Sequence, residues 1–270
     1  MARGVLPPPL SRAGPTFAGT RGSPVAPVAV LPPDARARVG SLERTRERVL
    51  ANLESVRERI SAACERCGRD PATVRLVAIG KGVEPHVISW ILEAGVVDLG
   101  ENYVRELRLK RERIAGGRWH FVGTLQRGSA HHVAELADVV HTVVPGSAFA
   151  RLQRGALARN RSFPALVEVD FTGERAGVAP GDVVTACDEV AGARGVRLAG
   201  LMTVPPLTQT AEEARPFFRG LTELLSEVAK RHPQAVELSM GMSLDYEVAV
   251  EEGATMVRLG TALFGPRRQA

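Results

Sequence analysis

Lys81 is the residue of this sequence best suited to covalent chemistry. It follows an apolar run at residues 76–79 and lies between two glycines. The run predicts a buried strand, so the lysine would lie where that strand ends and the backbone turns out. Arginine keeps its proton and is a poor nucleophile, whereas a desolvated lysine can lose its proton and form an imine with an aldehyde. The stretch alone leaves open the alternative that Lys81 is an ordinary strand-end lysine that reaches solvent.

The scarcity of lysine draws further attention to this position. Of the 35 basic side chains, only Lys81, Lys110 and Lys230 are lysines. Lys110 belongs to an Arg/Glu-rich run with a helical pattern, and Lys230 lies near the end of another helical run. Both patterns predict solvated helix faces. A lysine kept at a strand end of an arginine-rich chain therefore indicates a role that arginine cannot fill.

The cysteines and histidines give weaker signals. Cys64 and Cys67 have CxxC spacing, but no second pair completes a zinc site, so we interpret them as part of a helix end. His131 and His132 lack acidic neighbours at ligand spacing, which argues against a metal site. His120 lies between Trp and Phe on an expected strand, which favours a hydrogen-bonded interior residue over a general base.

The net charge of +5 does not indicate a nucleic-acid-binding surface. Residues 1–40 hold five arginines against one aspartate, which accounts for +4 and leaves +1 for residues 41–270. A nucleic-acid interface needs a clustered basic face on the folded part, and the sequence does not show one. No apolar run approaches the roughly 20 residues that a membrane helix needs, so we expect a soluble, cytoplasmic protein without a membrane partner.

The first part of the chain is predicted to be a disordered extension at residues 1–40, followed by a helix at residues 41–66. The extension contains eight of the 18 prolines and shows no helix or strand period. Its arginine-rich composition resembles a transit peptide, but we favour a plain extension. The helix carries one apolar stripe, made by Val49, Leu53, Val56, Ile60 and Ala63.

Eight apolar, strand-like runs alternate with helical runs from residue 74 onward. This alternation over roughly 200 residues predicts a parallel sheet closed into a single (β/α)8 TIM-type barrel at residues 41–267. An open doubly wound sheet is the alternative, but no GxGxxG motif follows the first strand. The expected strands are residues 74–80, 96–100, 118–123, 138–144, 164–170, 196–202, 235–239 and 255–259. The expected helices are residues 85–95, 103–115, 129–136, 147–158, 180–193, 211–231 and 244–252.

The ends of the last two strands suggest a phosphate site. Barrel active sites gather at the C-terminal strand ends, and phosphate is commonly held after strands seven and eight. Ser243 follows strand seven, and Gly260 and Thr261 follow strand eight. Singly, Ser243 could only cap a helix and Gly260 could only form a turn. Together they favour a phosphate site next to Lys81, because strand eight neighbours strand one in a closed barrel. A lysine that forms imines beside a phosphate site indicates pyridoxal 5′-phosphate.

Four segments also carry a resemblance to a known family. They are DLGENYVREL (98–107), WHFVGTLQ (119–126), LSMGMSLDYEVAVEEGAT (238–255) and VRLGTALFG (257–265). In this order they resemble the pyridoxal phosphate homeostasis protein family, whose members are similar to the isolated N-terminal barrel of alanine racemase. The resemblance covers about residues 42–267.

The resemblance implies a set of cofactor-binding residues. Lys81 would hold pyridoxal phosphate as an internal aldimine, and Arg258 matches the arginine that faces the pyridine nitrogen. Asn102 matches a residue of the cofactor pocket, and Met202 would pack near the ring. The family's phosphate-binding positions are matched by Ser243, Gly260 and Thr261.

The sequence also departs from the family pattern. The family usually has Ser-Lys-Thr around the lysine, whereas this chain has Gly80 and Gly82, which removes two hydroxyls near the imine. In the loop at residues 173–177, Arg175 and Ala176 stand where Lys-Ser is common.

The resemblance implies a protein that acts in vitamin B6 homeostasis, and we expect a monomer because no second domain is expected. It would buffer pyridoxal phosphate and hand it to PLP-dependent apoenzymes, with no turnover and no catalytic residue of its own. The alternative is a low-activity amino-acid racemase, because an arginine at the pyridine nitrogen suits racemases. Racemisation needs a base on each face of the substrate, and the β-rich domain that helps alanine racemase supply a tyrosine is not expected here. Tyr103 and Tyr246 are the only tyrosines, both at expected helix starts. A third possibility is an interaction protein that docks through residues 1–40.

Overall fold

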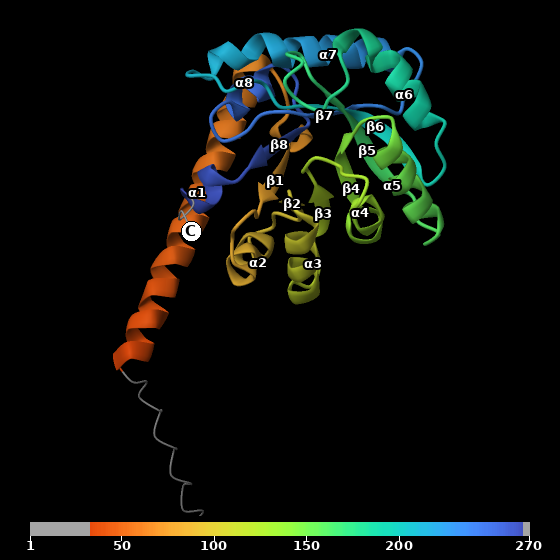
Figure 1. Cartoon of the computed structure of the whole chain (residues 1–270). Coiled ribbons are helices and arrows are strands. Elements are labelled where there is room, and N and C mark those ends of the chain that lie inside the picture. The colour runs from red at the N-terminus through yellow and green to blue at the C-terminus, as the bar shows by residue number, and fades with distance from the viewer. Residues whose placement is uncertain (1–32, 267–270) are drawn as a thin grey trace, which may run out of the picture. The chain divides into compact units, whose positions relative to one another are not determined.

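A computed structural model shows the predicted strands closed into a barrel (Figure 1). The structure describes residues 33–266, and side chains from residue 41. Eight parallel strands follow one another in chain order, and β8 pairs with β1 to close the sheet. The alternative of an open doubly wound sheet is therefore wrong. The strands are β1 (Arg75–Ile79), β2 (Asp98–Glu101), β3 (Arg118–Phe121), β4 (Val139–Val143), β5 (Phe163–Val169), β6 (Val196–Thr203), β7 (Glu237–Ser239) and β8 (Met256–Leu259).

The helices lie on the outside of the barrel, and every strand is followed by one of them (Figure 1). All seven helices expected between or after the strands are confirmed, with shifted ends. The helices are α1 (Pro33–Cys67), α2 (Pro85–Glu93), α3 (Val104–Arg113), α4 (Ala130–Leu136), α5 (Ser147–Leu157), α6 (Val183–Ala191), α7 (Arg215–Ala229), α8 (Tyr246–Glu251) and α9 (Thr261–Phe264). Three 3-10 turns accompany them, η1 (Pro71–Thr73), η2 (Pro180–Asp182) and η3 (Glu212–Ala214). Within residues 33–266, no helix combines the length and the apolarity that crossing a bilayer requires.

The first helix begins earlier than predicted. It starts at Pro33, eight residues before the expected start at residue 41. Proline is compatible with the first helical position, because its missing N–H has no partner within the helix there. The prediction of disorder for residues 1–40 otherwise falls on residues 1–32, which lie outside the described residues. The helix ends at Cys67, as the CxxC interpretation requires, with Cys64 buried and Cys67 exposed as free thiols.

The apolar stripe of α1 packs against the outside of the barrel where β8 meets β1. All five residues predicted for the stripe are buried. The Asn52 side chain donates a hydrogen bond to the Leu263 carbonyl at 2.9 Å, and Arg57 donates to the Ala94 carbonyl at 2.8 Å. Leu263 follows β8 and Ala94 follows α2, so this part of α1 covers the seam that closes the barrel.

Side chains at alternate strand positions point outward to the helices or into the barrel. The outward set and the helices form the main hydrophobic core. A smaller interior cluster is made by Val77, Ile79, Val139, Leu166, Met202 and Met256. Buried polar residues share the interior with it, among them Asp98, His120, His141, Ser239 and Arg258. Buried polar groups need hydrogen-bond partners, so the bonds among these five help to arrange the interior below the strand ends.

Candidate functional site at the barrel mouth

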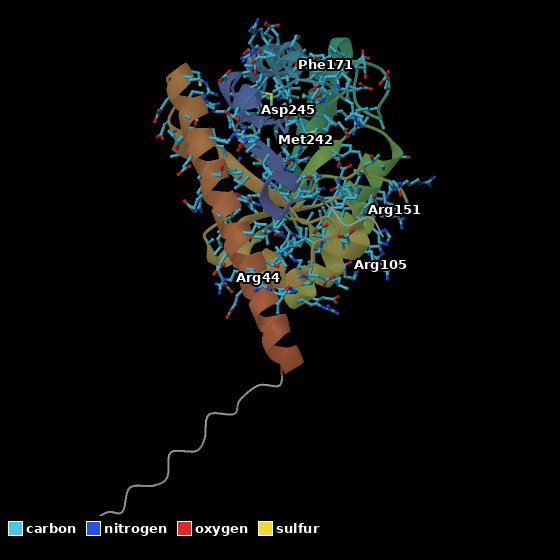
Figure 2. All side chains as sticks on the ribbon, turned by 90° about the vertical axis from the view of Figure 1, so that its left-hand side faces the viewer. Arg44, Arg105, Arg151, Phe171, Met242 and Asp245 are labelled. Carbon is cyan, nitrogen blue, oxygen red and sulfur yellow. The ribbon has the colours of Figure 1, made fainter. Side chains whose placement is uncertain are left out.

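A cavity of about 360 Å³ opens at the C-terminal ends of the strands. It lies at the end of the barrel where the sequence predicted the site. Of the seven predicted site residues, five line it, namely Asn102, Ser243, Arg258, Gly260 and Thr261. The other lining residues are Ile79, Val122, Arg175, Val204, Met242 and Leu244. Met242 and Asp245 mark the turn after β7 in Figure 2.

Two turns that line this cavity contain backbone N–H groups without a hydrogen-bond acceptor. The turn after β7 contributes Ser243 and Leu244, and the turn after β8 contributes Gly260 and Thr261. Within residues 33–266, none of these four N–H groups has a hydrogen-bond acceptor. Unpaired N–H groups that face a shared cavity are suited to bind an anion such as a phosphate.

Ser243 joins the two turns and does not cap α8, the helix that follows it in the chain. Its hydroxyl accepts a hydrogen bond from the Ala262 N–H at 3.1 Å. The next helix, α8, begins only at Tyr246, and the carboxylate of Asp245 accepts the Met242 N–H at 2.6 Å. The interpretation of Ser243 as an N-cap is therefore wrong, because the chain makes one further turn before the helix starts. What Ser243 does is hold the β7 turn against the β8 turn, so that their free N–H groups face one cavity.

Arg258 brings a fixed positive charge to the cavity. It is 5% exposed, and its guanidinium donates to the Ser239 hydroxyl at 2.6 Å and to the Thr203 carbonyl at 2.9 Å. Burial lowers the pKa of Arg258 to about 10, while the nearby carboxylates of Asp245 and Glu168 oppose this change. The guanidinium therefore remains protonated at neutral pH and keeps N–H donors for a ligand.

An unbroken chain of hydrogen bonds leads from Arg258 through the barrel interior. Ser239 bonds to Nδ1 of His141 at 2.8 Å, and Nε2 of His141 bonds to Nδ1 of His120 at 2.7 Å. Nε2 of His120 then bonds to Asp98 at 2.7 Å. These five residues, Asp98, His120, His141, Ser239 and Arg258, form what we call the interior hydrogen-bond chain. His120 is thus a hydrogen-bonded interior residue, as predicted.

With both imidazoles neutral, one proton arrangement satisfies this interior hydrogen-bond chain. Burial lowers the pKa of both His120 and His141, which favours the neutral imidazoles. A neutral His120 must donate from Nε2 to the Asp98 carboxylate, so its Nδ1 accepts from His141. Nδ1 of His141 must in turn accept the Ser239 hydroxyl proton. The oxygen of Ser239 is therefore an acceptor for Arg258, which fixes one edge of the guanidinium.

Asp98 closes the far end of the interior hydrogen-bond chain. Burial alone would raise the pKa of Asp98, but hydrogen bonds from His120 and Arg118 outweigh burial and lower it well below its usual value. Asp98 is 4% exposed and also pairs with Arg118 at the end of the barrel opposite the cavity. The interior hydrogen-bond chain thus runs between a buried cation and a buried carboxylate.

Lys81 lies beside the cavity but does not line it. It follows β1 by two residues, and its Nζ lies 5.0 Å from the centroid of the Tyr103 ring. Tyr103 is 53% exposed and precedes α3, so the lysine rests on an aromatic face at the rim. Met202 is also absent from the lining. It is 1% exposed and belongs to the interior cluster that includes Ile79, on which the cavity rests.

The prediction that Lys110 lies on a solvated face is wrong. Its side chain is 3% exposed, and its Nζ bonds to Glu101 at 2.6 Å and to Glu106 at 2.8 Å. Its Nζ also donates to the Gly80 carbonyl at 2.6 Å. Burial raises the pKa of Glu101 to about 7, although Lys110 opposes this rise. Lys230 does lie on a solvated face, where it pairs with Glu227.

The two glycines that replace the family's hydroxyl residues have local causes. A Cβ at Gly80 would lie 2.5 Å from Cδ1 of Ile88 and 2.6 Å from the Glu101 carboxylate, so a serine there requires the ends of these two side chains to shift. Gly82 has φ +71°, a conformation that side-chain-bearing residues rarely adopt. Packing therefore favours glycine at position 80, and the backbone conformation favours it at position 82.

Several functional residues were not predicted from the sequence. Arg175 lines the cavity, and its backbone N–H is held by Asp170 at 2.6 Å. The loop that carries it follows β5, so the strand-end rule could have included it. His141 and Ser239 were not assigned to the site either, since nothing in the local pattern pairs strands β4 and β7.

For metals, residues 41–266 contain no group of three His, Cys, Asp or Glu side chains that could hold an ion.

Comparisons with known proteins show which family this chain resembles along most of its length. Residues 51–268 match the family model described as alanine racemase, N-terminal domain. A pyridoxal phosphate homeostasis protein of Aquifex aeolicus is 38% identical over 221 residues, which cover 80% of this chain and 97% of that protein. The protein of the same name from Escherichia coli K12 is 35% identical over 225 residues, which cover 80% of this chain and 95% of that one.

Solved structures with the same architecture include one with bound cofactor. PipY of Synechococcus elongatus PCC7942, solved with PLP bound, is 32% identical with a TM-score of 0.69, and the match covers 78% of this chain and all of that one. An alanine racemase of Clostridium difficile in complex with cycloserine has a TM-score of 0.63 at 13% identity, and the match covers 83% of this chain and 60% of the racemase. At that identity the second likeness concerns the fold alone.

Proposed function

Because the chain belongs to the pyridoxal phosphate homeostasis protein family, we propose that its mouth cavity binds pyridoxal 5′-phosphate and that the protein buffers and carries this cofactor. The observation that carries the proposal is the convergence of four unpaired N–H groups, the buried Arg258 and Lys81 on one barrel mouth. The volume also fits, since small-molecule sites usually measure roughly 300–1,000 Å³.

The turns after β7 and β8 would receive the phosphate. Their four free N–H groups offer hydrogen bonds to its oxygens, and Ser243 holds the two turns together. Arg258 lies on the same lining and would donate to the pyridine nitrogen. Because Arg258 keeps its proton, the nitrogen that it contacts would stay an acceptor.

Lys81 is the amine that we assign to covalent attachment. Pyridoxal phosphate, when bound, would supply an aldehyde carbon for the Lys81 amine. Lys110 is committed to two carboxylates, and Lys230 pairs with Glu227 on α7. Within residues 41–266, Lys81 is therefore the one lysine with no carboxylate partner. Its contact with Tyr103 keeps the amine close to the cavity rim.

We propose that the protein binds the cofactor without turnover. Racemisation needs bases on opposite faces of the substrate. Tyr103 lies beside Lys81, and the two residues follow neighbouring strands, β2 and β1, so they approach the cavity from the same side. Tyr246 is buried at the start of α8 and does not line the cavity. A carrier that releases its cofactor to apoenzymes fits this one-sided arrangement better than a racemase does.

Borohydride trapping tests the proposal. Protein mixed with pyridoxal phosphate should develop an absorbance band that free cofactor lacks, and reduction should leave one pyridoxyl group on Lys81, located by peptide mass spectrometry. Lys81→Ala should fold and carry no label, and the matched control Lys230→Ala should label like the unmodified protein. A label on another residue, or none, would contradict the assignment.

Two further measurements separate the carrier from the alternative. The loaded protein should activate a pyridoxal-phosphate-dependent apoenzyme added in excess. It should not exchange the α-deuterium of L-amino acids faster than free cofactor does. Deuterium exchange above that rate which disappears in Lys81→Ala would favour the racemase instead.

A further inference from the structure

The turn that carries Lys81 is held by one cluster on both of its sides. On one side, Nζ of Lys110 donates to the Gly80 carbonyl at 2.6 Å. On the other side, the Glu106 carboxylate accepts the Gly82 N–H at 2.8 Å. Gly80 and Gly82 are the direct chain neighbours of Lys81, so both peptide groups that flank the lysine are fixed from α3.

The cluster is tied together internally and to the barrel. Lys110 bonds to Glu106, four residues earlier on α3, at 2.8 Å, and to Glu101 of β2 at 2.6 Å. Glu101 is fully buried, and one of its carboxylate oxygens has no partner within the described residues. Glu101, Glu106 and Lys110 are called the Lys110 cluster below.

Stability alone is a poor explanation for such a cluster. A buried ion pair pays for desolvation, and apolar side chains of similar volume are often as stable or more stable. Here Glu106 and Lys110 form hydrogen bonds with two loop peptides next to a reactive residue rather than with the backbone of a helix or strand. Two glycines flank the lysine, and glycines leave a turn free to change conformation unless other groups hold it.

We infer that the Lys110 cluster is a positioning device that holds the Gly80–Gly82 turn so that the Lys81 amine faces the bound aldehyde. The inference rests on the proposed role of Lys81. The residues of the cluster do not line the cavity, so they would act on the lysine through the backbone of the turn. Losing the cluster should slow attachment at Lys81 and leave the phosphate-binding turns after β7 and β8 intact.

Glu106 is the residue to change, because Lys110 keeps its partner Glu101 when Glu106 is replaced. Glu106→Ala removes the acceptor of the Gly82 N–H, and Glu106→Gln keeps an oxygen there. Glu112→Ala is the matched control, since Glu112 is an exposed acid of the same helix. The double variant Glu101→Gln, Lys110→Met removes both deeply buried charges together and tests the other side of the turn.

The first measurement needs no cofactor. In the protein without pyridoxal phosphate, amide hydrogen exchange at Gly82 should be on the order of tenfold faster in Glu106→Ala, because one charged hydrogen bond is lost. Exchange in the barrel strands should not change. Glu106→Gln should restore most of the protection, and Glu112→Ala should have no effect.

The second measurement separates position from affinity. The rate at which borohydride-stable label accumulates on Lys81 at saturating pyridoxal phosphate should fall on the order of tenfold in Glu106→Ala, while the half-saturating concentration stays unchanged. Unchanged Gly82 exchange, or faster exchange with an unchanged attachment rate, would overturn the inference. If the unmodified protein takes no label at Lys81, the proposed function fails, and the exchange experiment still decides whether the cluster holds the turn.

Discussion

Replacing Ser239 by alanine should destabilise the protein far more than the loss of one hydroxyl usually does. Ser239 is fully buried, and its oxygen and its proton are both in use. The oxygen accepts from Arg258 at 2.6 Å, and the proton goes to Nδ1 of His141. Alanine would leave a guanidinium N–H and an imidazole nitrogen without partners inside the barrel.

The expected cost follows from those two orphaned groups. A buried polar group without a partner costs about 1–3 kcal/mol, and more when it is charged. Two such groups give a loss of about 2–6 kcal/mol in the free energy of unfolding, a large part of the total stability of about 5–15 kcal/mol that is usual for folded proteins. Thr142→Val is the matched control, because the Thr142 hydroxyl donates one buried hydrogen bond, to the Gly123 carbonyl at 2.6 Å. It should cost about 1 kcal/mol.

Urea unfolding of the cofactor-free variants, followed by circular dichroism, measures both costs. A double-mutant cycle with His141→Phe should show a coupling of about 1 kcal/mol or more, because the imidazole orphaned by Ser239→Ala is then absent. The proton arrangement derived for the interior hydrogen-bond chain is refuted if Ser239→Ala costs no more than Thr142→Val. A coupling energy near zero would refute it as well.

Three further predictions concern the cavity and its support. Arg258→Ala should weaken retention of pyridoxal phosphate by about 1–3 kcal/mol, measured by equilibrium dialysis, and equal retention would remove Arg258 from the site. Gly80→Ser should destabilise the fold by about 1–3 kcal/mol through contact with Ile88, and adding Ile88→Ala should recover part of this loss in urea unfolding; a fully stable Gly80→Ser variant would contradict the packing argument. The low pKa of Asp98 in the folded state gives stability that is present above the unfolded pKa of about 4 and is lost as pH falls below it. The slope of unfolding free energy against pH below pH 4 should therefore be smaller in Asp98→Asn by up to about 1.4 kcal/mol per pH unit, and an unchanged slope would speak against the pairing.

The sequence was sufficient for the barrel because its signals are local. Eight apolar runs alternate with amphipathic runs. The pattern of each run predicts its own strand or helix and needs no information from the rest of the chain. The strand-end rule then placed Ser243, Gly260 and Thr261 at one mouth, and the family resemblance added Asn102 and Arg258; all five line the cavity. The start of α1 was missed because the proline- and arginine-rich composition of the first 40 residues hides a helix that begins at Pro33.

The failures concern contacts between residues that are distant in the sequence or depend on tertiary packing. In the sequence, Lys110 has the pattern of a surface lysine. Its burial depends on Glu101 of β2 lying against α3, and no helical period predicts this contact. His141 and Ser239 are 98 residues apart, and their hydrogen bond exists only because β4 and β7 face each other inside the barrel. Apolar core positions recur with the period of a helix or a strand, but such polar pairs do not. A single sequence therefore does not predict them.

The interior hydrogen-bond chain also predicts how two separate halves of the barrel would behave. Asp98, His120 and His141 belong to the first four strands, while Ser239 and Arg258 belong to the last four. A half-barrel ending after β4 would leave Nδ1 of His141 without its hydrogen-bond donor, and the complementary half would leave the Ser239 hydroxyl proton without its acceptor. Neither half should be soluble alone, yet co-expressed halves would have a specific polar reason to recombine in register.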